Sequence, residues 1–77
     1  MVIDIRDRNS YLLGHIDDAI NIDKSALLSN PDKYLNKTDI YYIYCNSGIS
    51  SKRVVNHLNL LGYNTVNIDG GYNKFKS

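Results

Sequence analysis

The feature that most constrains the fold is a run of β-branched and aromatic residues that ends at the only cysteine of the chain. Residues 40–44 have the composition of a strand, and Cys45 follows directly. A short segment containing Gly48 then leads into residues 52–61, which predict an amphipathic helix. This order places the cysteine at the carboxyl end of a strand, where open α/β sheets bind their ligands.

The remaining sequence indicates further strands that alternate with short helices. The expected strands are residues 2–5, 19–22 and 65–68. Brief helices are expected near residues 24–28, 31–35 and 72–75, whereas residues 6–10 read as a turn and 11–16 as a single helical turn closed by Gly14. Such alternation predicts one α/β domain over residues 1–77, with a mostly parallel sheet of about four strands and helices on both faces.

Composition excludes several classes of function. The chain has 77 residues, a net charge of +1 and no long block of like charge, so no nucleic-acid or membrane surface is expected. One cysteine and two histidines form neither an internal disulfide nor a zinc motif, and no metal or organic cofactor is implied. A free thiol without a leader-like segment fits a reducing cytoplasm.

Four segments, in register, resemble the single-domain rhodaneses, which are small sulfurtransferases. The matching segments are residues 2–6, residues 14–16 with 19–22, residues 45–51, and residues 62–63 with 69–71. The resemblance covers essentially the whole chain and implies a three-layer rhodanese-like sandwich. Rhodaneses usually carry a further strand and helix before the first of these segments, so we expect a trimmed or naturally short form.

The resemblance, together with the position of Cys45, predicts sulfur transfer. The cysteine would attack a donor such as thiosulfate, carry the sulfur as a persulfide and pass it to a thiol or cyanide acceptor. Ser50 or Ser51 is expected to cap the following helix, and Gly48 to allow a positive φ. The predicted substrate-binding residues are the loop that curls around the sulfur: Asn46, Ser47, Gly48, Ile49, Ser50 and Ser51. Partners would be a small sulfur-donor anion, a thiol acceptor and a possible sulfur-accepting protein.

Three alternatives bear on Cys45. A lone cysteine is often a small buried apolar residue. Phosphatases of the same fold use a loop one residue longer that an arginine closes, and Ser51 occupies that position here, which disfavours them. Because many relatives carry arginines inside the loop and this chain does not, a non-catalytic interaction module is the second hypothesis. Lys52 and Arg53 either steer anionic donors or form a solvated face.

Other polar residues carry weaker hypotheses. His15 is expected to pack in a turn rather than to act as a base, and His57 to be solvated. Asp4 and Arg6 either orient the active loop from the neighbouring strand end, or form a plain ion pair or lie at the surface.

Overall fold

The computed structural model describes all 77 residues, Met1–Ser77. Four strands and five helices alternate along the chain: β1 (Val2–Asp4), α1 (Arg8–Leu13), β2 (Ile20–Asn21), α2 (Lys24–Ser29), α3 (Pro31–Tyr34), β3 (Ile40–Tyr44), α4 (Ile49–Leu60), β4 (Asn64–Asn67) and α5 (Gly71–Lys76). The predicted α/β class is confirmed. No helix in the chain has the length and hydropathy needed to cross a membrane.

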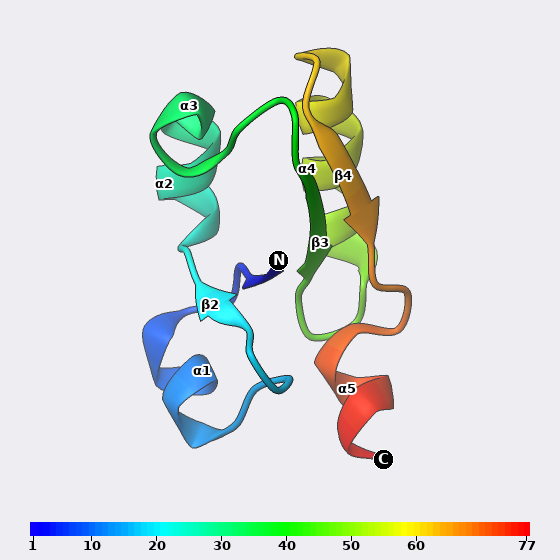
Figure 1. Cartoon of the computed structure of the whole chain (residues 1–77). Coiled ribbons are helices and arrows are strands. Elements are labelled where there is room, and N and C mark those ends of the chain that lie inside the picture. Colours follow the sequence, from blue (N-terminus) through cyan, green and yellow to red (C-terminus); the bar gives the residue numbers. More distant parts are fainter.

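The sheet is fully parallel, with strand order β2-β1-β3-β4. The register aligns Asp4 of β1 with Tyr44 of β3, so these two strands end side by side. Parallel strands need crossover connections, and here helices supply them. In Figure 1, α1 and α5 lie at the end of the molecule toward which the β4 arrow points, and α2 and α3 lie at the other end. The loops that follow β1 and β3 therefore meet at one edge.

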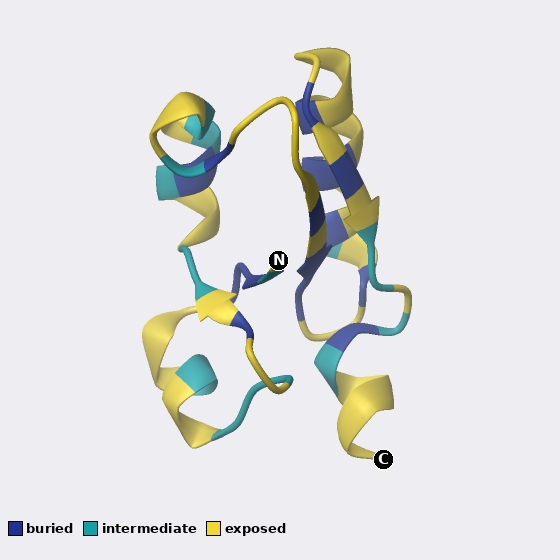
Figure 2. Ribbon diagram, viewed as in Figure 1, coloured by how far each residue is buried: buried dark blue, intermediate teal, exposed yellow.

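The core lies between one face of the sheet and helices α2 and α4. Leu27 and Leu58 are completely buried, and full burial of such a side chain stabilises the fold by about 1.5–3 kcal/mol. Figure 2 shows the buried residues gathered on β3 and on the side of α4 toward the sheet. The predicted amphipathic character of α4 is confirmed, because Val54, Val55 and Leu58 are buried. Leu61, within the predicted range, follows the helix and is 45% exposed.

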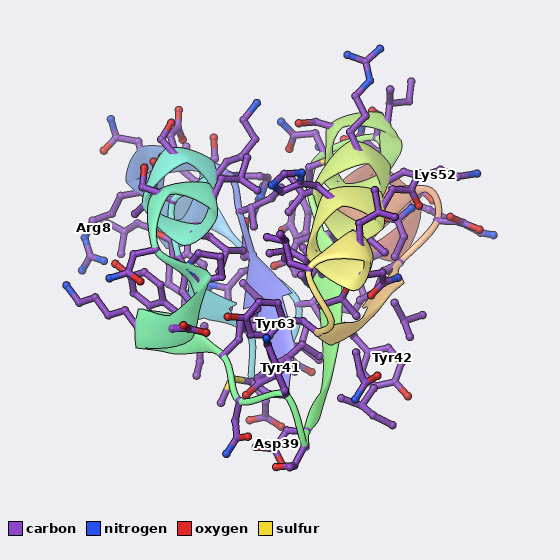
Figure 3. All side chains as sticks on the ribbon, turned by 90° about the horizontal axis from the view of Figure 1, so that it is seen from above. Arg8, Asp39, Tyr41, Tyr42, Lys52 and Tyr63 are labelled. Atoms are coloured by element: carbon purple, nitrogen blue, oxygen red, sulfur yellow. The ribbon has the colours of Figure 1, made fainter.

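The opposite sheet face is covered unevenly. Tyr41 points into the interior beside Tyr63, whereas Tyr42 extends from the other side and is 43% exposed (Figure 3). Tyr44 lies on the same face as Tyr42 yet is fully buried. The carboxyl end of β3 is therefore enclosed on both faces, and its middle is enclosed on one.

The prediction of a turn over residues 6–10 and a single turn over 11–16 is wrong, because α1 spans Arg8–Leu13. The prediction that Gly14 closes this segment is confirmed, since Gly14 is the C-cap of α1. Asp7 begins this helix, since its side chain accepts a hydrogen bond from the Ser10 amide at 2.8 Å. That cap stabilises a helix too short to show a clear apolar period.

Candidate functional site

Cys45 directly follows β3, and main-chain donors converge on its sulfur. The amides of Gly48 and Ser51 lie 3.2 and 3.3 Å from Sγ. The Ser51 hydroxyl lies 3.3 Å from Sγ, with the thiol donating to it in the neutral form. We call these groups the sulfur cradle. No charged side chain is part of the cradle, so neutral dipoles alone face the sulfur.

Two opposing effects act on the pKa of Cys45. Burial raises it, because the residue is only 8% exposed and a thiolate loses hydration there. The Ser51 hydroxyl, which donates to Asn67 while the thiol is neutral, turns to donate to the thiolate. Together with the amides of Ser51, Gly48 and Ser47 it favours the thiolate and outweighs burial. The pKa of Cys45 therefore lies below its usual value, as a nucleophilic thiol requires.

The curl of the loop depends on Gly48. Its φ is 90°, which confirms the predicted positive value, and a Cβ there would come within 2.8 Å of the Gly70 nitrogen. Gly48 is also the N-cap of α4, which begins at Ile49. The prediction that Ser50 or Ser51 caps the helix is therefore wrong, because both lie in its first turn. That position is what directs the Ser51 amide and hydroxyl to the sulfur.

Hydrogen bonds from helix α5 fix the beginning of the loop. Its Tyr72 and Asn73 amides donate to the carbonyl oxygens of Cys45 and Asn46, at 2.9 and 3.0 Å. Gly71 lies against the same two carbonyls, and a Cβ at this position would collide with the Cys45 oxygen. These bonds occupy the carbonyl groups, and the peptide units of the loop are fixed in place.

Asn67 at the end of β4 completes the support. Its side-chain oxygen accepts a hydrogen bond from the Ser51 hydroxyl at 2.6 Å, and its amide donates to the Gly48 carbonyl at 3.1 Å. Sequence reasoning missed this residue. The available signal was topological, since β4 is the parallel neighbour of β3 and both strands end at the same edge.

A second buried group lies beside the cradle, and we call it the ion cluster: Asp4, Arg6 and Tyr44. Arg6 Nη2 lies 2.7 Å from Asp4 Oδ2, and the Tyr44 hydroxyl donates to the same oxygen at 2.6 Å. The hydrogen bond to Asp4 raises the pKa of Arg6, and burial raises that of Tyr44. Arg6 Nη1 also contacts the Asn46 side-chain oxygen at 3.3 Å. Both expected roles of the pair therefore occur together.

A depression of about 320 Å³ lies over the cysteine, and we call it the Cys45 pocket. Of the predicted substrate-binding residues, Asn46, Ser47 and Ser50 line it. Ile49 does not line the pocket. Its side chain is 68% exposed, and its amide donates to the Ser47 hydroxyl. Gly48 and Ser51 contact the sulfur as part of the cradle rather than line the pocket.

Two cationic side chains from outside the loop, those of Arg6 and Lys24, also line the Cys45 pocket. Sequence reasoning had considered Arg6 but had not singled out Lys24. Arg6 is already paired with Asp4. Lys24, at the start of α2, has only the Ser50 hydroxyl as a partner, at 3.4 Å. Lys24 therefore brings an unneutralised charge to a loop that contains no arginine.

The other candidate side chains lie away from the sulfur. The His15 ring stacks on Tyr11 with centroids 3.9 Å apart, which agrees with the expected packing role. Lys52 is exposed and points away from the body of the molecule (Figure 3), whereas Arg53 and His57 line a separate groove. No group of three or more His, Cys, Asp or Glu side chains is placed to hold a metal ion.

Comparison with curated proteins finds sulfurtransferases. The chain is 32% identical to the thiosulfate sulfurtransferase GlpE of Coxiella burnetii, over all of this chain and 72% of that protein. It is also 32% identical to the adenylyltransferase and sulfurtransferase uba4 of Ogataea parapolymorpha, over 91% of this chain. That match spans only 18% of the length of uba4, so it concerns one part of a larger protein.

Solved structures agree with this relationship. A rhodanese-like domain protein from Staphylococcus aureus superimposes with a TM-score of 0.81 at 34% identity, covering 91% of this chain and 68% of that one. A Staphylococcus saprophyticus protein superimposes with a TM-score of 0.89 at 34% identity, covering 96% and 73%. The family model described as Rhodanese-like domain matches residues 1–77. The chain therefore belongs to the rhodanese-like domain family.

Proposed function

We propose that this chain is a sulfurtransferase in which Cys45 is the nucleophile and carries a sulfane sulfur as a persulfide. The observation that carries the proposal is the convergence of the Gly48 and Ser51 amides and the Ser51 hydroxyl on Sγ. A thiolate needs such donors to exist near neutral pH, and a buried apolar cysteine does not. Relatives named thiosulfate sulfurtransferase support the same chemistry.

The first half of the reaction loads the cysteine. The Cys45 thiolate attacks the outer sulfur of thiosulfate, a new S–S bond forms, and the S–S bond of the donor breaks. Sulfite leaves with the electron pair, and the negative charge on sulfur stays at the cysteine as a persulfide anion. Charge and atoms balance without a proton, an oxidant or a cofactor.

The Cys45 pocket is the proposed binding place of the donor. Lys24 and Arg6 both line it, together with Asn46, Ser47 and Ser50. Because Asp4 already neutralises Arg6, Lys24 supplies the positive charge for a dianion, and it acts against the Asp7 carboxylate that also lines the pocket. The anion would thus be held by one ammonium group and by the loop, rather than by arginines within the loop.

The direct test is mass spectrometry of the intact protein after incubation with thiosulfate. The expected result is a gain of one sulfur atom on Cys45 that a reductant removes. The matched control is Cys45→Ser, which preserves the size of the side chain and should gain nothing. No gain with any persulfide donor, or an equal gain in the variant, excludes the proposal.

A non-catalytic module is the second candidate. It is favoured by the burial of Cys45, which is 8% exposed, and by the lack of any cation in contact with the sulfur. Thiol reactivity separates the two candidates. Rapid alkylation of Cys45 by iodoacetamide near neutral pH, with an apparent pKa below that of a free thiol, supports the enzyme; an inert thiol supports the module.

The free thiol also underlies the proposed location. Cys45 is the only cysteine and is unpaired. Oxidising compartments convert exposed reactive thiols to disulfides, so the cytoplasm is the compartment in which this chemistry would persist.

A further inference from the structure

A groove between α2 and α4 adjoins the Cys45 pocket, and we call it the α2–α4 groove. It has a volume of about 490 Å³, compared with about 320 Å³ for the Cys45 pocket. The two share Lys24, Ser47 and Ser50 in their walls. A molecule lying in the groove therefore has the mouth of the Cys45 pocket at one end.

Three of the five polar residues that line the groove are basic, and the other two are Ser47 and Ser50. Lys24 comes from α2, and Arg53 and His57 come from α4. No carboxylate lines it, and the only ion pair in the protein joins Arg6 to Asp4, so Lys24 and Arg53 are both unneutralised. With a net charge of only +1 on the whole chain, this gathering of cations is local. Such a surface attracts anions.

Between the cations the lining is apolar. Leu28 of α2 faces the groove, and so do Ile49 and Val54 of α4. Ile49 is 68% exposed, although apolar side chains of this size are usually buried. Inorganic thiosulfate gains nothing from an apolar wall. The volume also falls within the range of about 300–1,000 Å³ that is typical of sites for small organic ligands.

We propose that the α2–α4 groove binds the sulfur acceptor, and that this acceptor is a small organic thiol that carries carboxylate groups. This inference depends on the sulfurtransferase function proposed above. The carboxylates would lie near Arg53 and His57, the carbon chain against Leu28 and Val54, and the thiol at the mouth of the Cys45 pocket.

The transfer step balances. The persulfide anion left by the loading step first takes up a proton from water. The acceptor thiolate then attacks the outer sulfur of the neutral Cys45 persulfide, and an S–S bond forms on the acceptor. The S–S bond at Cys45 breaks, and its electron pair returns to Sγ as a thiolate that the sulfur cradle stabilises. The acceptor leaves as a persulfide, with its proton on the outer sulfur.

The test starts from enzyme loaded with sulfur by thiosulfate and freed of excess donor. Single-turnover transfer is then measured with three acceptors of similar size: 3-mercaptopropionate, 2-mercaptoethanol and cysteamine, which are anionic, neutral and cationic. Second-order rate constants are divided by the thiolate fraction of each acceptor. The expected order is anionic, neutral, cationic, and added salt reduces the spread.

A variant then assigns the preference to the groove. Arg53→Gln should lower the ratio of the 3-mercaptopropionate rate to the 2-mercaptoethanol rate about two- to fivefold, the range for one exposed ion pair. The matched control is Lys52→Gln, which removes a neighbouring exposed cation that does not line the groove. Circular dichroism checks that both variants fold.

Each outcome decides a separate point. If loading fails, the proposed function is excluded, whatever the groove does. If loading succeeds but the three acceptors react equally, or Arg53→Gln and Lys52→Gln lower the ratio equally, the groove is not the acceptor site and the inference is wrong. A preference for the anionic acceptor that is lost in Arg53→Gln but kept in Lys52→Gln supports the inference.

Discussion

The sulfur cradle and the ion cluster lie side by side at the ends of β3 and β1, and each surrounds a buried acidic group. In the ion cluster a full positive charge meets the Asp4 carboxylate, with Arg6 Nη2 at 2.7 Å. In the cradle only neutral donors meet the Cys45 sulfur. A fully paired carboxylate is held as a structural group, whereas a sulfur stabilised by dipoles keeps a lone pair of usable nucleophilicity. The difference separates what holds the site together from what reacts in it.

The two regions also differ in how they are assembled. Cradle groups come from seven successive residues, Cys45 to Ser51, whereas Asp4 and Tyr44 are 40 residues apart and meet by strand pairing. Arg6 joins the regions through its contact with Asn46. Because the guanidinium is occupied by Asp4, it positions the loop without adding a charge to the sulfur.

The largest expected effect comes from removing the proposed nucleophile. Cys45→Ala should reduce sulfur transfer to background, because the persulfide has no other attachment point. The free energy of unfolding should change far less, since the cradle contributes chemistry rather than most of the packing. Activity with thiosulfate and urea denaturation measure the two quantities. Transfer that survives in a folded Cys45→Ala protein would contradict the division between the regions.

A substitution at Asp4 breaks the ion cluster and should affect stability. Asp4→Asn leaves Arg6 buried without its charge partner and should lower the free energy of unfolding by about 3–5 kcal/mol. Urea denaturation measures the loss. The matched control is Asp39→Asn, an exposed carboxylate beside the start of β3 (Figure 3), which should have almost no effect. Equal stability of the two variants would show that the cluster is not structural.

A milder change tests the neutral member of the same cluster. Tyr44→Phe removes a hydroxyl that donates to Asp4 and accepts from the Ile16 amide at 3.0 Å. The expected cost is about 1–3 kcal/mol, because these buried groups lose a partner. The alkylation rate of Cys45 should stay close to that of the wild type. A large change in that rate would mean that the two regions are coupled more tightly than the contacts indicate.

Ser51→Ala weakens the cradle without altering its backbone. Loss of the hydroxyl should raise the pKa of Cys45, since this hydrogen bond is the strongest of the effects that lower it. A hydrogen bond to a charged group is worth about 1.5 kcal/mol, so alkylation by iodoacetamide at pH 7 should slow about tenfold. Ser29→Ala, on the exposed surface of α2, serves as the control. An unchanged pH profile would remove Ser51 from the cradle.

The smallest effect concerns stability against pH. Because the pKa of Cys45 is lower in the folded state, the unfolded chain binds more protons at pH values between the two pKa values. The free energy of unfolding of the wild type, minus that of Cys45→Ala, should therefore rise with pH through this window and level off above about 8.5. Denaturation at several pH values measures the difference. A fall with rising pH would contradict a stabilised thiolate.

Much of the fold could be predicted because local pattern and tertiary structure agree. The strand over residues 40–44 has the predicted bounds, and Gly48 has the predicted positive φ. The failures were local ambiguities. Helix α1 depends on a cap at Asp7 rather than on an apolar period. Ser50 and Ser51, which had been expected to cap α4, lie within its first turn.

Residues 40–51 alone determined that a cysteine would follow a strand and face a glycine-containing curl, because those features depend on neighbours in sequence. Only the tertiary structure brought in Asn67 and Lys24, and it placed Arg6, already a candidate from the sequence, against Asn46. They come from separate strands and helices, and parallel pairing with crossover connections is what carries their side chains to one edge of the sheet. Short-range pattern thus decided the position of the proposed nucleophile, and strand order decided its surroundings.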